Sequence, residues 1–186
     1  HHLPQSEFKL LSIHTRNLVP MCHLCNHAKL AGFDEDGVGF LHPYYDLIPN
    51  IDFVKATVTI DGAALVTSFA IDLAAALPAG FADRLRDQMV ELDLDSRYQK
   101  EVNTYITSHA AALHLAFRTS GQEGVRKMLR LQANYETKAF HRNHWRPVLL
   151  RALKKFDVFT AGGFTNVLTI PDDVIDDLDN EDEADA

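Results

Sequence analysis

The sequence lacks the features that would place it in a membrane, outside the cell or in a common nucleotide-binding class. No run approaches the roughly 18 to 20 apolar residues of a membrane-spanning helix. The first residues do not have the basic and then apolar order of a secretory signal. No internal repeat, Gly-rich phosphate loop or G-x-S-x-G motif occurs. We therefore expect a cytoplasmic protein that has no membrane partner.

Cysteine is almost absent, and its two occurrences form a single C-x-x-C pair, Cys22 and Cys25. Two cysteines cannot build the disulfide framework of a small secreted domain. In a cytoplasmic protein this spacing is typical of a metal site or of a redox pair. Because nothing nearby suggests a thioredoxin-like unit, we favour structural zinc, with packed or redox-active thiols as the alternative.

Basic residues are fewer than acidic ones, and the formal net charge of −8 argues against a partner rich in phosphate. The acidic excess is local, however. Residues 171–186 hold nine acidic residues and no basic one, which leaves 17 of the 26 acids to balance 18 bases elsewhere. We predict a disordered acidic tail over 171–186, or alternatively a regulatory tail that competes with nucleic acid for a basic surface.

Hydrophobic periodicity predicts an α+β fold. Residues 53–60 and 64–71 alternate with a period of two around the turn signal Asp61-Gly62, which indicates a β-hairpin. A short helix is expected over 23–30. Downstream the period becomes 3.6 and predicts a mainly α-helical C-terminal domain, with apolar stripes over 81–92, 98–117, 125–135 and 145–156. Pro147 can be tolerated only near the start of the last helix.

The first residues are unusually rich in histidine and carry the pattern that is most informative about function. It runs His1-His2-Leu3-Pro4-Gln5-Ser6, then Asn17, then Cys22-x-x-Cys25-Asn26-x-x-Lys29. This order resembles the HNH (ββα-metal, His-Me finger) endonuclease family, whose pattern is Asp-His-x-x-Pro, a later Asn, and C-x-x-C-[His/Asn]-x-x-Lys. The resemblance covers residues 1 to 31. It implies a small ββα-metal HNH module over 1–50, followed by an extension domain over 51–170.

The resemblance implies a metal-dependent enzyme that hydrolyses phosphodiester bonds in DNA. His1 would be the general base, because the pKa of imidazole lies near neutrality. Asn26 would bind Mg²⁺ or Mn²⁺ through its side-chain oxygen, and Asn17 would hold the catalytic loop in place. Arg16 and Lys29 would contact phosphates of the substrate, with ordinary solvated charges as the alternative.

The family pattern also has an Asp directly before the base and commonly a second C-x-x-C upstream, and neither precedes His1 here. We expect an upstream segment to carry both, completing the catalytic and the zinc site. If the protein instead begins at His1, we expect a metal-poor, inactive site. The remnant of a purification tag is the alternative interpretation of His1-His2.

Two further clusters have structural interpretations that compete with functional ones. His42-Pro43-Tyr44-Tyr45-Asp46 predicts a packed turn, or a turn that seats the extension against the nuclease module. Residues 143–146 predict the start of a helix with a core Trp145, rather than a contact to nucleic acid. His109 and His114, on or beside the stripe over 98–117, are expected to be structural.

A nuclease of this kind would act in restriction or anti-phage defence. One alternative is a non-catalytic, zinc-supported DNA-binding module, which would bind DNA but not cleave it with Mg²⁺ or Mn²⁺. Another is a nuclease subunit that is active only with a partner such as an ATPase, or in a homo-oligomer. RNA is an alternative substrate, and no reading helix that would define a target sequence is recognisable.

Overall fold

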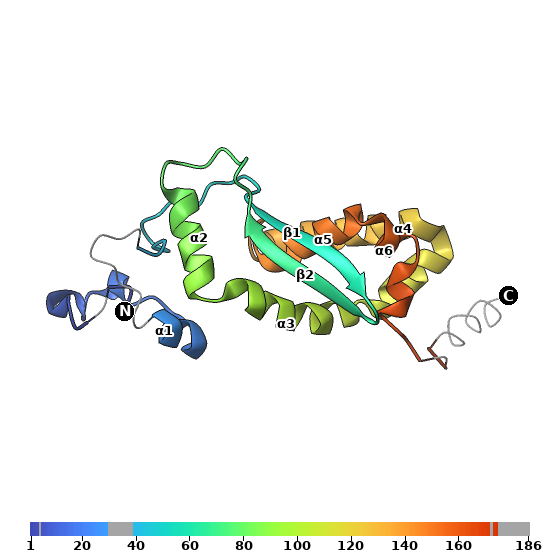
Figure 1. The fold of residues 1–186 in the computed structure, drawn as a ribbon, viewed down its shortest axis with the longest axis horizontal. Helices are drawn as coiled ribbons and strands as arrows, with labels where there is room; N and C mark the ends of the chain where they lie inside the picture. Colours follow the sequence, from blue (N-terminus) through green and yellow to red (C-terminus); the bar gives the residue numbers. More distant parts are fainter. Residues whose placement is uncertain (4, 30–38, 172, 175–186) are drawn as a thin grey trace. The chain divides into compact units, whose positions relative to one another are not determined.

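The computed structural model describes residues 1–3, 5–29, 39–171 and 173–174. These residues form six α-helices, three short 3-10 helices and one antiparallel hairpin of two strands (Figure 1). This mixed content confirms the predicted α+β class. Within the described residues, no helix combines the length and the apolar character that crossing a membrane requires. The predicted tail, apart from residues 171, 173 and 174, lies outside them.

Backbone contacts divide the chain into two compact units. The N-terminal unit consists of residues 1–54 and 70–97, and the helical unit consists of residues 55–69 and 98–186. Residues 1–50, predicted as a separate module, therefore share a unit with the first helix of the predicted extension.

The N-terminal unit begins with η1 (Lys9–Leu11), η2 (Thr15–Asn17) and α1 (His23–Lys29), and α1 lies where the sequence predicts a helix. The strands of a ββα module are not formed in the described part of residues 1–50. The reason is local. Backbone N–H groups between Leu11 and Leu18 bond to carbonyls three residues earlier, which produces turns in place of a strand ladder. The HNH module itself therefore stays a prediction.

Helix α2 (Phe81–Glu91) completes the N-terminal unit and begins after Gly80, whose φ of 73° suits glycine. Its predicted apolar stripe is confirmed at both ends, because Phe81 and Leu92 are buried. The Phe81 ring meets Phe53 edge to face, with 5.6 Å between centroids. This contact attaches α2 to the segment that leads out of the N-terminal residues.

The hairpin pairs β1 (Val54–Asp61) with β2 (Ala64–Ile71), as the alternating pattern predicts. Its turn is shifted by one residue from the expected Asp61-Gly62. Gly62 has a φ of 57° and therefore takes the first central position of the turn, which Ala63 completes. On β2, the buried side chains are Leu65, Thr67 and Phe69.

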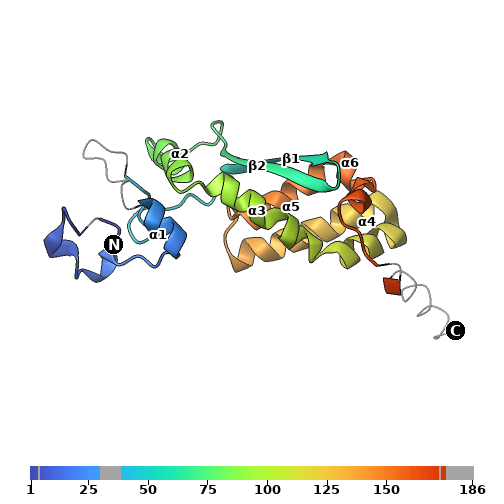
Figure 2. The same cartoon turned by 60° about the horizontal axis from the view of Figure 1, so that its bottom comes forward.

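The helical unit contains α4 (Ala110–Ala139), α5 (Trp145–Lys155), α6 (Asp157–Thr160), η3 (Gly163–Asn166) and most of α3 (Leu94–Thr107). Helices α4 and α5 pack along each other (Figures 1 and 2). Fully buried side chains from these elements form the core: Val102, Ile106, Leu113, Val125, Leu129, Leu149, Leu150, Leu153, Phe159 and Phe164.

The prediction of one continuous helix over 98–117 is wrong, because the chain breaks between α3 and α4. There the Ser108 hydroxyl donates to the Tyr105 carbonyl at 2.6 Å, so a side chain satisfies a carbonyl near the end of α3. Helix α4 changes direction at Ser120 and Gly121, which lie outside helical φ/ψ values. The predicted helix over 125–135 is the second half of α4.

The start of α5 is as predicted. Trp145 is 9% exposed at its first position, and Pro147 stands in the first turn, where no helical N–H is lost. The His144 ring caps the helix by accepting from the Arg146 N–H at 3.3 Å. His109 and His114 are structural too, since each ring lies within hydrogen-bonding distance of a backbone carbonyl.

Candidate active site

Asn17 links two parts of the N-terminal segment. Its side chain is 5% exposed, its Oδ1 accepts from the Leu3 N–H at 2.6 Å, and its Nδ2 donates to the Leu3 carbonyl at 3.2 Å. Nδ2 also donates to the Leu11 carbonyl at 3.0 Å. The Asn17 carbonyl accepts from the His2 N–H at 2.7 Å. One amide thus holds the residues beside the proposed base against η1 and η2.

Lys29 ties α1 to the same segment. Its Nζ donates to the His1 carbonyl at 2.6 Å and to the His2 carbonyl. The ammonium is half-buried, and burial lowers the pKa of Lys29. This geometry does not favour the predicted phosphate contact of Lys29, because its ammonium group already donates to two backbone carbonyls. Nor is Lys29 the ordinary solvated charge of the alternative interpretation, because the ammonium is half-buried.

The His1 ring is held by one of its nitrogens. Nε2 lies 2.9 Å from the Ser12 carbonyl, which can only accept, so Nε2 carries the proton of the neutral ring. Nδ1 then retains its lone pair. A fixed tautomer with one nitrogen available as an acceptor is what a general base needs. His1 is exposed, so water can reach it.

Asn26 lies on α1, one helical turn before Lys29 and on the same face. Its side chain is exposed and, among the described residues, has no hydrogen-bond partner. The amide oxygen is therefore available to a ligand. Lys29 joins this face of α1 to the residue pair His1-His2.

His2 contacts His42, a residue outside the motif. The two ring centroids are 4.1 Å apart. Burial, reinforced by the nearby His42 and Lys29, lowers the pKa of His2 to about 4. His2 is consequently neutral at physiological pH, and no role for its side chain follows from the sequence pattern.

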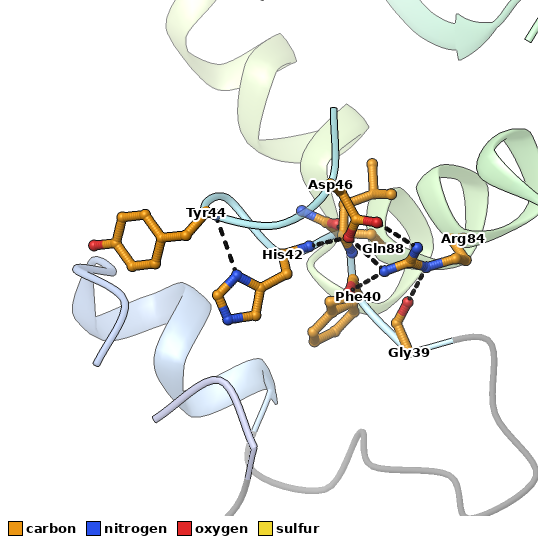
Figure 3. A network of polar contacts seen from close by, with 8 residues as sticks. Gly39, Phe40, His42, Tyr44, Asp46, Arg84 and Gln88 are labelled. Atoms are coloured by element: carbon orange, nitrogen blue, oxygen red, sulfur yellow. Dashed lines mark hydrogen bonds and ion pairs between the residues drawn. The ribbon is translucent and has the colours of Figure 1, made fainter. Parts of the chain in front are cut away.

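His42 belongs to a turn that is anchored on α2 (Figure 3). Asp46 accepts from the His42 N–H at 2.5 Å and forms two hydrogen bonds with the Arg84 guanidinium, at 2.8 and 2.6 Å. Arg84 also donates to the carbonyls of Gly39 and Phe40 at 2.9 Å. The bond from Arg84 holds the pKa of Asp46 below its usual value. This agrees with the alternative in which the turn joins the first residues to the extension.

Arg16 and the aromatic residues of this turn lie on the exposed side. The Arg16 guanidinium stands 5.5 Å from the centroid of the Tyr45 ring. Thr15, Arg16, Pro43 and Tyr44 line an open hollow of about 640 Å³. Arg16 remains a candidate for substrate contact, because the hollow beside it is open.

Cys22 and Cys25 stand at the start of α1. The Cys22 Sγ accepts from the Cys25 N–H at 3.4 Å, and this bond lowers the pKa of the Cys22 thiol. Burial raises the pKa of Cys25, although the Arg97 guanidinium donates to its Sγ at 2.9 Å and opposes that shift. Both thiols are free.

The donor atoms suit the predicted metals only in part. Within the described residues, no group of three or more His, Cys, Asp and Glu side chains could hold a metal ion. Two thiols one turn apart match the soft donors of zinc, but a structural zinc site needs two further ligands. The Asn26 oxygen matches Mg²⁺ or Mn²⁺, and Mg²⁺ commonly keeps several of its waters.

Sequence reasoning missed Arg84, Gln88 and the contact of His2 with His42. Gln88 accepts from the Leu41 N–H at 3.1 Å, 47 residues away. No local pattern marks such a pairing.

The chain as a whole matches no protein-family model, no curated protein and no solved structure.

Proposed function

We propose that the N-terminal unit carries the catalytic face of an HNH-type endonuclease that hydrolyses phosphodiester bonds in DNA. One observation carries the proposal. Asn17 and Lys29 join the three separated pieces of the motif, by hydrogen bonds that span 14, 27 and 28 residues. Residues that match the family pattern by their order are thus linked by hydrogen bonds, which supports the loop-holding role that we propose for Asn17.

The chemistry assigned to this chain is proton transfer at His1. Its Nδ1 accepts a proton from water as the water oxygen forms a bond to phosphorus and the bond from phosphorus to the leaving oxygen breaks. A divalent cation, when bound, neutralises charge on the phosphate and the leaving oxygen. Asn26 would contribute an oxygen to that cation. Ser12 keeps the His1 ring in the required tautomer through the Nε2 contact.

Cleavage of supercoiled plasmid DNA tests the proposal, in Mg²⁺, in Mn²⁺ and in EDTA. His1→Ala is expected to lower the metal-dependent rate by about 100- to 10,000-fold, the usual contribution of a general base. His14→Ala is the matched control, because His14 is an exposed histidine of the same segment. Equal cleavage by wild type and His1→Ala would contradict the proposal.

Two substitutions at Asn26 separate metal binding from helix stability. Asn26→Asp retains an oxygen donor and is expected to keep metal-dependent cleavage, whereas Asn26→Ala is expected to lose it. His27→Ala, at the next exposed position of α1, should have no effect. A wild-type metal requirement and rate in Asn26→Ala would remove Asn26 from the site.

The thiols support a structural zinc site next to this face. Both stand at one end of the helix that carries Asn26, so zinc would stabilise α1. We expect metal analysis of the purified protein to find zinc that Cys22→Ser reduces and Ser12→Ala does not. DNA binding without cleavage by the zinc-loaded protein would favour the non-catalytic binding module instead.

A further inference from the structure

The open hollow between η2 and the turn at residues 42–46 brings Arg16, an expected phosphate contact, next to residues that the HNH pattern does not use. It is lined by Thr15 and Arg16 on one side and by Pro43 and Tyr44 on the other. Its volume of about 640 Å³ lies within the usual range for sites that bind small molecules. Both walls belong to the N-terminal unit.

Both walls are held in place by buried or paired groups. Asn17, the last residue of η2, is buried and bonded to Leu3 and Leu11. The opposite turn is fixed by Asp46 and Arg84, and the Tyr44 N–H donates to His42 Nδ1 at 3.1 Å. A site that is ordered before the ligand arrives loses less entropy on binding.

The exposed surface of the hollow combines an aromatic ring with a positive charge. Tyr44 is 51% exposed, and in Figure 3 its ring points away from Arg84. The His42 ring contacts both tyrosines, with centroids 5.7 Å from Tyr44 and 4.6 Å from Tyr45. Tyr45 also lies under the Arg16 guanidinium, whereas Tyr44 lines the hollow and so offers its ring to a ligand there. Among the residues that the structure describes, no acidic side chain lines the hollow, and Asp46 of the same turn is paired with Arg84. A ring beside a cation suits a nucleobase and its phosphate.

We propose that this hollow binds one unpaired nucleotide of a nucleic-acid strand, with the base stacked on Tyr44 and the phosphate against Arg16. The inference rests on the proposed function and gives its substrate a property, a preference for single-stranded or frayed DNA. A base inside a duplex is already paired and stacked, so it cannot present its face to Tyr44 without being extruded.

Binding of a fluorescently labelled oligothymidylate in buffer without Mg²⁺ or Mn²⁺ tests the proposal without cleavage. Tyr44→Ala is expected to weaken binding about 5- to 150-fold, the range that loss of one base–aromatic stack corresponds to. Tyr44→Phe should bind like wild type, because the ring is retained. Tyr135→Ala is the matched control, since Tyr135 is an exposed tyrosine of the helical unit.

Arg16→Ala should weaken binding and reduce the slope of log affinity against log salt by about one, as expected for one lost phosphate contact. Arg130→Ala, an exposed arginine on α4, is its control. A blunt duplex of matched length should be bound more weakly than the single strand, and Tyr44→Ala should change duplex binding little. Wild-type affinity of Tyr44→Ala for the oligothymidylate would overturn the inference, and so would an equal loss in Tyr135→Ala.

The nucleotide site and the nuclease proposal can be refuted independently of each other. If Tyr44→Ala loses binding while no metal supports cleavage by the wild type, the nucleotide site stands and the nuclease proposal falls. If cleavage depends on His1 but Tyr44→Ala binds and cleaves as wild type does, the nucleotide site falls alone.

Discussion

Asn17→Ala is the substitution that most directly probes the linkage of the motif. It removes a buried side chain whose oxygen and nitrogen make three hydrogen bonds, to the N–H and carbonyl of Leu3 and to the carbonyl of Leu11. The substitution leaves these three backbone groups without their partner. The expected consequence is release of residues 1–3 from η1, with the rest of the protein still folded.

The magnitude follows from the number of bonds. A buried group that loses its hydrogen-bond partner costs about 1 to 3 kcal/mol, so three backbone groups left without any partner would cost at least about 3 kcal/mol. The bonds are only partly buried, so water replaces part of this loss and about 2 kcal/mol remains. That free energy corresponds to a roughly 30-fold increase in local opening.

Amide hydrogen exchange at Leu3 measures this opening, because its N–H donates to the Asn17 side chain. We expect exchange at Leu3 to accelerate by about 30-fold, and amides of α5 to be unchanged. Asn17→Asp is a sharper variant. It preserves the acceptor for Leu3 but replaces the donor, so an oxygen faces the two carbonyls.

The two variants together can refute the reasoning. If Leu3 exchanges at the wild-type rate in Asn17→Ala, the side chain does not hold the segment. If Asn17→Asp behaves like wild type, the bonds that Nδ2 donates contribute nothing. The first outcome would remove the loop-holding role and with it the main support for the nuclease proposal, whereas the second would leave that role to the bond that Oδ1 accepts from Leu3.

Three further outcomes are expected. The pKa of His2 is about 4 in the folded protein and near 6.5 in the unfolded chain, so the unfolded chain binds more protons between these pH values. The N-terminal unit should therefore lose stability as pH falls from about 6.5 to 4. If unfolding curves of His2→Phe show the same dependence of stability on pH, His2 is excluded as its source. Arg84→Lys keeps the positive charge but loses the bidentate pairing with Asp46. Hydrogen exchange of the amides in the turn at residues 42–46 should therefore accelerate about 5- to 30-fold, which corresponds to about 1 to 2 kcal/mol. Unchanged amide exchange would contradict the anchoring of this turn by Arg84. Tyr105→Phe removes the hydroxyl that donates to buried Glu136 at 3.0 Å, and it should lower the stability of the helical unit by about 1 to 2 kcal/mol. Denaturation followed through the fluorescence of the single tryptophan measures this loss. An unchanged stability would show that water replaces the hydroxyl.

Residue order along the chain was sufficient for the elements that depend on local periodicity. Alternation about Gly62 predicts the hairpin, and apolar spacing predicts α2 and α5, with Pro147 in the first turn. These features depend on neighbours within a few residues, where side-chain direction follows from backbone geometry alone. His1, Asn17 and Asn26 were selected on a different ground, the resemblance of their order in the sequence to the HNH family pattern.

Only the tertiary structure decided which charged groups meet. Lys29 reaches the carbonyls of His1 and His2, and Arg84 reaches Asp46 across 38 residues, and no local spacing marks either contact. The physical reason is that a half-buried charge must find a partner wherever the packed chain supplies one. The break between α3 and α4 at Ser108 and His109 was not predicted either. The apolar stripe continues across it and gives no sign that the Ser108 hydroxyl donates to the Tyr105 carbonyl near the end of α3.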